Sequence, residues 1–123
     1  DKLTYKDHLK RFENMDLFLD TFPYNAHVTA MEALRTGVPT LTIIGETFAS
    51  RVAGSLLSAL DLNYLICNNI DSYIEVACEM ASNKKTYKNI KLKLLNNIDI
   101  LSNSKKYTRD LENIYTKLAL EKI

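Results

Sequence analysis

Tryptophan is absent from the 123 residues, and glycine, proline, cysteine and histidine are scarce, with three, two, two and two copies. So few glycines and prolines exclude a collagen-like or low-complexity chain. No apolar run approaches the roughly 20 residues of a membrane-spanning helix, and the charged start from Asp1 to Asp7 is no signal peptide. The missing initiator methionine predicts that the chain is part of a longer polypeptide.

The cysteines offer no framework for a structural metal. Cys67 and Cys78 lie eleven positions apart without a CxxC pattern, and only two histidines accompany them. This pattern excludes an ordinary zinc site, and no metal is expected. Both cysteines stand in apolar stretches, which favours reduced thiols in the core and a cytoplasmic location.

The net charge of the chain does not indicate a class of binding partner. Sixteen basic and fifteen acidic side chains give a net charge of +1, and 46% of the residues are apolar. These values predict one domain over 1–123 with a sizeable core. They exclude a chain built mainly to neutralise nucleic-acid phosphates, and the basic stretch from Lys84 to Lys93 is read as a solvated helix face.

Strand and helix patterns alternate in the first half of the chain. Short apolar runs predict strands over 17–21, 40–44 and 65–67, and helical spacing predicts helices over 5–15, 29–35 and 48–60. This order predicts an α/β fold, a partial Rossmann-like parallel sheet of about three strands with flanking helices. A complete doubly wound sheet has more strands, so we expect an unpaired strand edge through which copies of the chain form a homo-oligomer.

The second half of the chain is predicted to be all helical. A capping box over 72–75 precedes one helix, a longer helix runs from Tyr87 to Leu101, and Thr108 and Asp110 open the last. The expected buried stripes are Ile74, Ala77, Cys78 and Ala81, then Leu111, Ile114, Tyr115 and Leu118.

The segment 25–32 is the candidate binding site, because it follows a strand and opens a helix. Ligands of open α/β sheets bind at that edge, and free amides at a helix start favour phosphate. His27 and Thr29 can donate to an anion, and Glu32 can accept from the paired hydroxyls of a ribose. The alternative is that Asn25 or Thr29 merely caps the helix while Glu32 faces water.

Several motifs occur in an order that resembles one known family. They are Asp16–Thr21, Pro23–His27, Ala33–Leu34, Gly37–Pro39, Gly45–Ala53 and Lys106–Glu112 followed by Tyr115. Together they resemble the C-terminal catalytic lobe of the O-linked N-acetylglucosamine transferase (SPINDLY-like) family of protein glycosyltransferases. The resemblance implies a two-lobe (GT-B) enzyme, of which this chain is the C-terminal part of the nucleotide-sugar-binding lobe.

The resemblance also assigns roles to residues that bind UDP. The residues around His8 indicate only a solvated helix residue. In the family resemblance, His8 matches the histidine that stacks on uracil. His27, the backbone of Val28, and Thr29 match the segment that grips the diphosphate, and Glu32 stands where an Asp binds the ribose. The family motif reads His-Thr-Thr, so Val28 replaces a hydroxyl-bearing residue. Such departures fit a diverged member, another nucleotide sugar or a weakened site.

The implied activity is inverting transfer of N-acetylglucosamine from UDP-GlcNAc to Ser or Thr of proteins, without a metal or other cofactor. No catalytic residue of the family falls in this chain, which alone is expected to be inactive. The implied partners are the UDP-sugar, an acceptor protein, an N-terminal lobe and helical repeats. Alternatives are a glucosyltransferase acting on Asn or another acceptor, and a non-catalytic binding or assembly module.

Overall fold

A computed structural model describes residues 3–121, which form a three-stranded parallel sheet with helices on both sides. The strands are β1 (Phe18–Leu19), β2 (Thr40–Ile43) and β3 (Ile66–Cys67), in the order β1-β2-β3. Phe18 pairs with Thr40, and Thr42 pairs with Ile66. The predicted three-stranded α/β fold is therefore confirmed.

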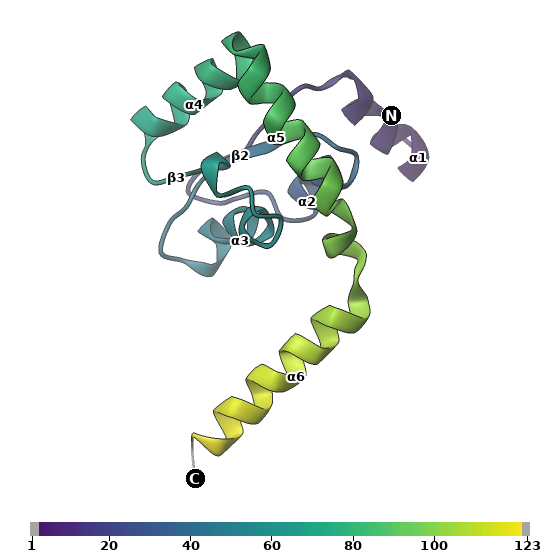
Figure 1. Cartoon of the computed structure of the whole chain (residues 1–123), viewed down its shortest axis with the longest axis vertical. Coiled ribbons are helices and arrows are strands. Elements are labelled where there is room, and N and C mark those ends of the chain that lie inside the picture. The colour runs from purple at the N-terminus through teal and green to yellow at the C-terminus, as the bar shows by residue number, and fades with distance from the viewer. Residues whose placement is uncertain (1–2, 122–123) are drawn as a thin grey trace.

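The helices follow the predicted alternation over the first half of the chain. Their bounds are α1 (Tyr5–Lys10), η1 (Arg11–Asn14), α2 (Val28–Arg35), η2 (Phe48–Ser50), α3 (Val52–Ala59), η3 (Asn63–Leu65), α4 (Ile70–Ser82), α5 (Lys84–Asn97), η4 (Ile98–Ser102) and α6 (Ser104–Leu120). Helices α2 and α3 are the two crossover connections, and α3 and α4 lie on opposite sides of the sheet (Figure 1).

Helix α2 ends at a glycine that permits a sharp turn into β2. Gly37 has a φ of +83°, a conformation that residues with a Cβ rarely adopt. Its amide donates to the Leu34 carbonyl, and the Val38 amide donates to the Ala33 carbonyl. This pair of bonds is a Schellman motif, and it turns the chain directly into the buried strand β2.

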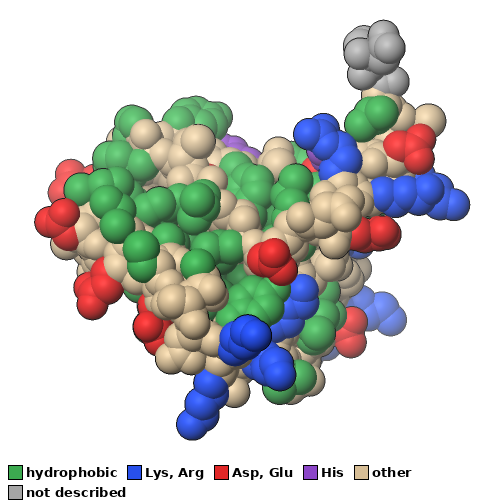
Figure 2. Space-filling view, turned by 90° about the horizontal axis from the view of Figure 1, so that it is seen from above, with side chains coloured by type: hydrophobic (Ala, Val, Ile, Leu, Met, Phe, Trp, Pro, Cys, Tyr) green, Lys and Arg blue, Asp and Glu red, His purple; other side chains and the backbone are tan. Residues whose placement is uncertain are grey.

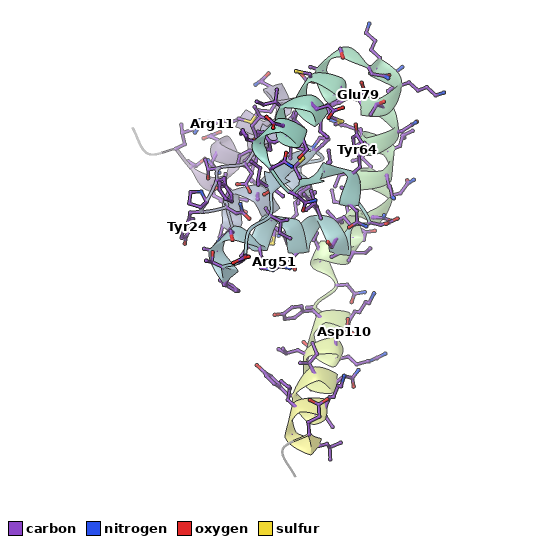
Figure 3. All side chains as sticks on the ribbon, turned by 90° about the vertical axis from the view of Figure 1, so that its left-hand side faces the viewer. Arg11, Tyr24, Arg51, Tyr64, Glu79 and Asp110 are labelled. Carbon is purple, nitrogen blue, oxygen red and sulfur yellow. The ribbon has the colours of Figure 1, made fainter. Side chains whose placement is uncertain are left out.

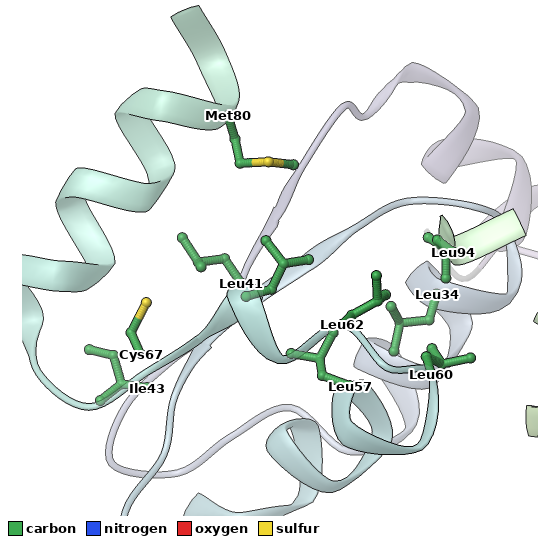
Figure 4. Close-up of a cluster of buried hydrophobic side chains, with 10 residues drawn as sticks. Leu34, Leu41, Ile43, Leu57, Leu60, Leu62, Cys67, Met80 and Leu94 are labelled. Atoms are coloured by element: carbon green, nitrogen blue, oxygen red, sulfur yellow. The ribbon is translucent and has the colours of Figure 1, made fainter. Parts of the chain in front are cut away.

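The core lies between the sheet and both helix layers. All four residues of β2 are buried, so β2 is the central strand of the described sheet. Figure 4 shows the main buried cluster, to which α2, α3, β2 and α5 all contribute. Its members are Leu34, Leu41, Ile43, Leu57, Leu60, Leu62, Leu65, Cys67, Met80 and Leu94. Removing this apolar surface from water is the main force that holds the elements together.

Two boundary predictions are wrong because local hydrogen bonds override the apolar spacing. The expected single helix over 48–60 is divided at Arg51, since Thr47 and Ser50 form a capping box that holds the turn η2. The expected capping box over 72–75 is also absent. Helix α4 starts at Ile70, and the side chain of Asn69 accepts from the Ser72 amide.

The buried face of α4 differs from the predicted stripe. Tyr73, Val76, Ala77 and Met80 pack against the core, whereas Ile74, Cys78 and Ala81 are exposed. The prediction that both thiols are buried is therefore wrong for Cys78 and correct for Cys67. Burial raises the pKa of the Cys67 thiol, which favours its neutral form.

Helix α6 projects away from the body of the molecule (Figure 1). It starts at Ser104 rather than near Thr108, because the Asn103 side chain accepts from the Lys106 amide. Three members of the predicted apolar stripe, Ile114, Tyr115 and Leu118, are exposed, and the fourth, Leu111, is half-buried. Along the described part of α6 no residue is buried.

Apolar side chains are also exposed on the body. Figure 2 shows hydrophobic side chains gathered over one face of the body. Large exposed apolar residues from the strands, loops and helices of the body include Leu19, Phe22, Ile70 and Ile74. No helix within residues 3–121 combines the length and the apolar character that crossing a bilayer requires.

Candidate functional site

Asp20 builds the turn that leads from β1 to α2. Asp20 is 7% exposed, and its carboxylate accepts three hydrogen bonds. The donors are the amides of Thr21 and Ala26, at 2.9 and 2.7 Å, and the Thr42 hydroxyl, at 2.7 Å. The turn is thereby tied both to itself and to the central strand.

Tyr73 of α4 and the loop residue Asn25 fix the same turn from two sides. The Tyr73 hydroxyl donates to the Asp20 carbonyl at 2.9 Å. Burial, together with the negative charge of Asp20, raises the pKa of Tyr73, which favours the protonated hydroxyl that donates this bond. Asn25 is fully buried, and its amide group donates to the carbonyls of Thr21 and Ile43.

The start of α2 is open. His27 occupies the N-cap position, and its side chain makes no capping hydrogen bond. Val28 is 63% exposed and Thr29 is exposed, so their amides lie near the surface at the positive end of the helix. The alternative in which Asn25 or Thr29 caps the helix is wrong.

His8 and Glu32 meet at one side of α2. The His8 Nε2 atom lies 3.1 Å from Glu32 Oε2, and the two side chains are 35% and 12% exposed. The His8 ring also makes an edge contact with Phe12, with 5.7 Å between ring centroids. Glu32 therefore does not face water, and His8 is not merely a solvated helix residue.

The imidazole of His27 lies between two aromatic rings. The Tyr24 ring stacks on it at 5.1 Å with an interplanar angle of 18°, and the Phe48 ring meets it edge-on at 6.1 Å. His27 Nε2 is buried and has no hydrogen-bond partner among residues 3–121. A buried nitrogen without a partner is costly unless a ligand or water satisfies it.

The loop after β2 carries Phe48 to this position. The backbone N–H of Asn25 donates to the Ala49 carbonyl at 3.0 Å, which joins this loop to the turn before α2. Gly45 is required because a Cβ there would overlap the Ser50 hydroxyl. Arg51 donates to the Gly45 carbonyl at 2.9 Å and so closes the loop.

A cavity of about 470 Å³ opens near the carboxyl ends of the strands. Its lining comes from the last residue of β2, from the residues that follow β1 and β3, and from the start of α4: Asp20, Phe22, Ile43, Asn68, Asn69, Ile70 and Tyr73. Open parallel sheets bind ligands at this edge. Within the described part of the chain, no cluster of three or more His, Cys, Asp or Glu side chains is placed to hold a metal ion.

Of the predicted site residues, Val28, Thr29 and Glu32 lie on α2 and His27 is its N-cap. His8 of α1 contacts Glu32. Sequence reasoning missed Asp20, Tyr24 and Phe48. A carboxylate at the end of a strand could have marked Asp20. The two aromatic residues stand in separate loops, and nothing in their spacing predicts that they meet at His27.

A three-stranded parallel sheet with flanking helices and crossover connections through α2 and α3 places the chain among Rossmann-like α/β proteins. The fold matches a solved glycosyltransferase of the GT-B type, a mutant of the Thermobaculum terrenum O-GlcNAc transferase, with a TM-score of 0.85 and 30% identity. That match covers 94% of this chain and 22% of the other.

The sequence comparisons agree with the structural match. The profile of glycosyl transferase family 41 matches residues 3–111. A probable UDP-N-acetylglucosamine–peptide N-acetylglucosaminyltransferase SPINDLY of Solanum lycopersicum is 37% identical over 114 residues, and the corresponding Caenorhabditis elegans transferase is 32% identical over 111. The chain belongs to glycosyl transferase family 41. These matches cover 91% and 89% of the chain but only 12% and 10% of the two relatives.

Proposed function

We propose that this chain is the UDP-binding portion of a protein glycosyltransferase that transfers N-acetylglucosamine from UDP-GlcNAc to Ser or Thr. The observation that carries the proposal is the open start of α2, flanked by His27 and by the His8–Glu32 pair. Its free amides and positive helix end suit a diphosphate. The names of the family relatives, which are peptide N-acetylglucosaminyltransferases, supply the sugar and the acceptor class.

Each site residue has a role in this proposal. The imidazole of His27, the Val28 amide and Thr29 bind the diphosphate. Glu32 accepts from the ribose hydroxyls, because its carboxylate is held in place by His8 at 3.1 Å. His8 presents its ring to the uracil. Binding of this kind would stabilise the charge that develops on the departing UDP.

The remaining machinery is proposed to lie outside this chain. Acceptor binding, the catalytic residues, an N-terminal lobe and helical repeats belong to the longer protein, and the chain alone is inactive. We include metal-independent transfer and a cytoplasmic location in the proposal; the free thiols of Cys67 and Cys78 support the latter. The outer edge of β1 is proposed to pair with a second copy when nothing else covers it.

UDP is expected to bind the chain weakly, because only one side of the ligand is contacted. In an NMR titration with millimolar UDP, resonances of His8, His27, Thr29 and Glu32 should shift together. Exposed residues of α6 serve as internal controls and should not move. A titration in which those four positions stay unchanged would contradict the proposed site.

Replacing Val28 with Thr is expected to tighten UDP binding by about tenfold. The added hydroxyl provides one more donor to the diphosphate, and a hydrogen bond to a charged group contributes about 1.5–3 kcal/mol. Val28 is 63% exposed, so stability should change little. Calorimetric titration of the parent and Val28→Thr checks the prediction, with Val28→Ala as the control. Weaker binding by Val28→Thr would show that the phosphates do not contact this face.

A panel of UDP-sugars, assayed with the whole cellular protein that contains this segment, tests the alternative activities. Transfer of N-acetylglucosamine to Ser or Thr supports the proposal, and glucose transfer to Asn or another acceptor replaces it by the related activity. UDP binding without any transfer identifies a non-catalytic module. Addition of EDTA should leave the transfer rate unchanged.

A further inference from the structure

The orientation of the His27 imidazole depends on its two aromatic neighbours. The side chain does not cap α2, and within the described chain its buried Nε2 has no hydrogen-bond partner. A histidine is usually held by a hydrogen bond to one ring nitrogen. Here the stacked Tyr24 ring sets the plane of the imidazole, and the edge contact with Phe48 limits its rotation.

Tyr24 and Phe48 contribute little to the core. Tyr24 is 66% exposed and Phe48 is 81% exposed, so each ring leaves most of its surface in water. Figure 3 shows Tyr24 at the margin of the body, away from Tyr64. Burial of apolar area, the usual reason for a large aromatic side chain, does not account for either residue.

The loops that carry the two rings are themselves fixed. The Thr21 hydroxyl donates to the Tyr24 carbonyl at 2.7 Å. The hydrogen bond from the backbone N–H of Asn25 to the Ala49 carbonyl joins the two loops, and each of these residues directly follows one of the two aromatic residues. Two separate loops therefore bring their aromatic side chains to one imidazole at the open start of a helix.

We propose that Tyr24 and Phe48 are positioning residues that hold the His27 imidazole ready for the diphosphate of the nucleotide ligand. This inference rests on the proposed function. An imidazole that is held in advance loses less conformational freedom when the ligand binds, and this raises affinity without any new contact to the ligand.

Tyr24→Leu and Phe48→Ala test the proposal, each in the 123-residue chain. Affinities for UDP, inorganic pyrophosphate and uridine are measured by NMR titration. We expect each variant to weaken UDP and pyrophosphate binding about fivefold to tenfold, the range of a lost aromatic pair. Uridine, which has no phosphate, should bind as before. Tyr24→Phe should bind UDP and pyrophosphate as the parent does, because it keeps the aromatic ring. Tyr64→Leu, which removes a tyrosine ring elsewhere, is the matched control and should also leave both affinities unchanged.

A spectroscopic readout separates positioning from a general structural effect. Loss of the stacked ring in Tyr24→Leu should shift the His27 ring protons, and Tyr64→Leu should leave them in place. In a His27→Ala background, Tyr24→Leu should cause no further loss of pyrophosphate affinity, because the two residues act through one another. Thermal unfolding of each variant should stay within a few degrees of the parent.

The outcomes distinguish this inference from the proposed function. If the parent chain binds neither UDP nor pyrophosphate, the nucleotide site itself is wrong. If the parent binds both, while Tyr24→Leu and Phe48→Ala stay within twofold, the positioning role is wrong and the site stands. An equal loss of uridine affinity would also overturn the positioning role, because the rings would then contact the nucleoside.

Discussion

Asp20→Ala is expected to lower the free energy of unfolding by about 3–5 kcal/mol and to abolish UDP binding. The carboxylate accepts from two backbone amides and from the Thr42 hydroxyl, and it is 7% exposed. Its removal leaves buried donors without acceptors. Because the Ala26 amide is one of them, the turn that places His27 would lose its anchor.

Urea denaturation of the parent and Asp20→Ala measures the loss of stability, and a UDP titration measures the loss of binding. Asp20→Asn should fall between the two, because it keeps the shape but weakens the accepted bonds. Asp16→Ala removes an exposed carboxylate just before the same strand and should change stability by less than about 0.5 kcal/mol. A loss below about 1 kcal/mol for Asp20→Ala would mean that the turn is held by other contacts.

The order of strands and helices could be predicted because each element carries its own local pattern. The run over 40–44 is short and β-branched, and the structure makes it the buried central strand β2. Gly37 marked the end of α2 because only a residue without a Cβ adopts its φ without strain. Such features depend on a few neighbouring residues, so sequence alone reveals them.

The face of a helix that becomes buried is less predictable. On α4 the predicted stripe of Ile74, Ala77, Cys78 and Ala81 has helical spacing, but only Ala77 of these residues packs against the core. Tyr73 and Met80 pack there as well. Periodicity defines a stripe; it does not say whether the chain itself supplies the surface that covers it. The exposed stripe on α6 shows the same limit.

In the candidate site, too, some residues could be predicted from the sequence and others could not. His27, Thr29 and Glu32 could be proposed as site residues because they lie at or near the start of one helix. His8 could be proposed only through the family resemblance. The contact between His8 and Glu32 joins residues 24 positions apart. Asp20, Tyr24 and Phe48 act through loop geometry, which apolar spacing does not encode.

Leu57→Ala is expected to lower the free energy of unfolding by about 3–4 kcal/mol, whereas Leu118→Ala should change it by less than about 0.5 kcal/mol. Leu57 of α3 is fully buried in the main cluster, so its truncation leaves a cavity beneath the central strand. Leu118 is 51% exposed on α6. Both changes remove the same atoms from a helix and differ only in packing.

Chemical denaturation of the two variants separates the core from the projecting helix, and the slope of the transition should be the same in both. A destabilisation above about 1 kcal/mol for Leu118→Ala would show that the stripe on α6 is covered in solution, by a second copy or by the body. In that case the loss of stability should depend on protein concentration if a second copy covers the stripe, and should not depend on it if the body of the same chain does. A small effect for Leu57→Ala would contradict the packing of α3 against β2, and with it the placement of the loop that brings Phe48 to His27.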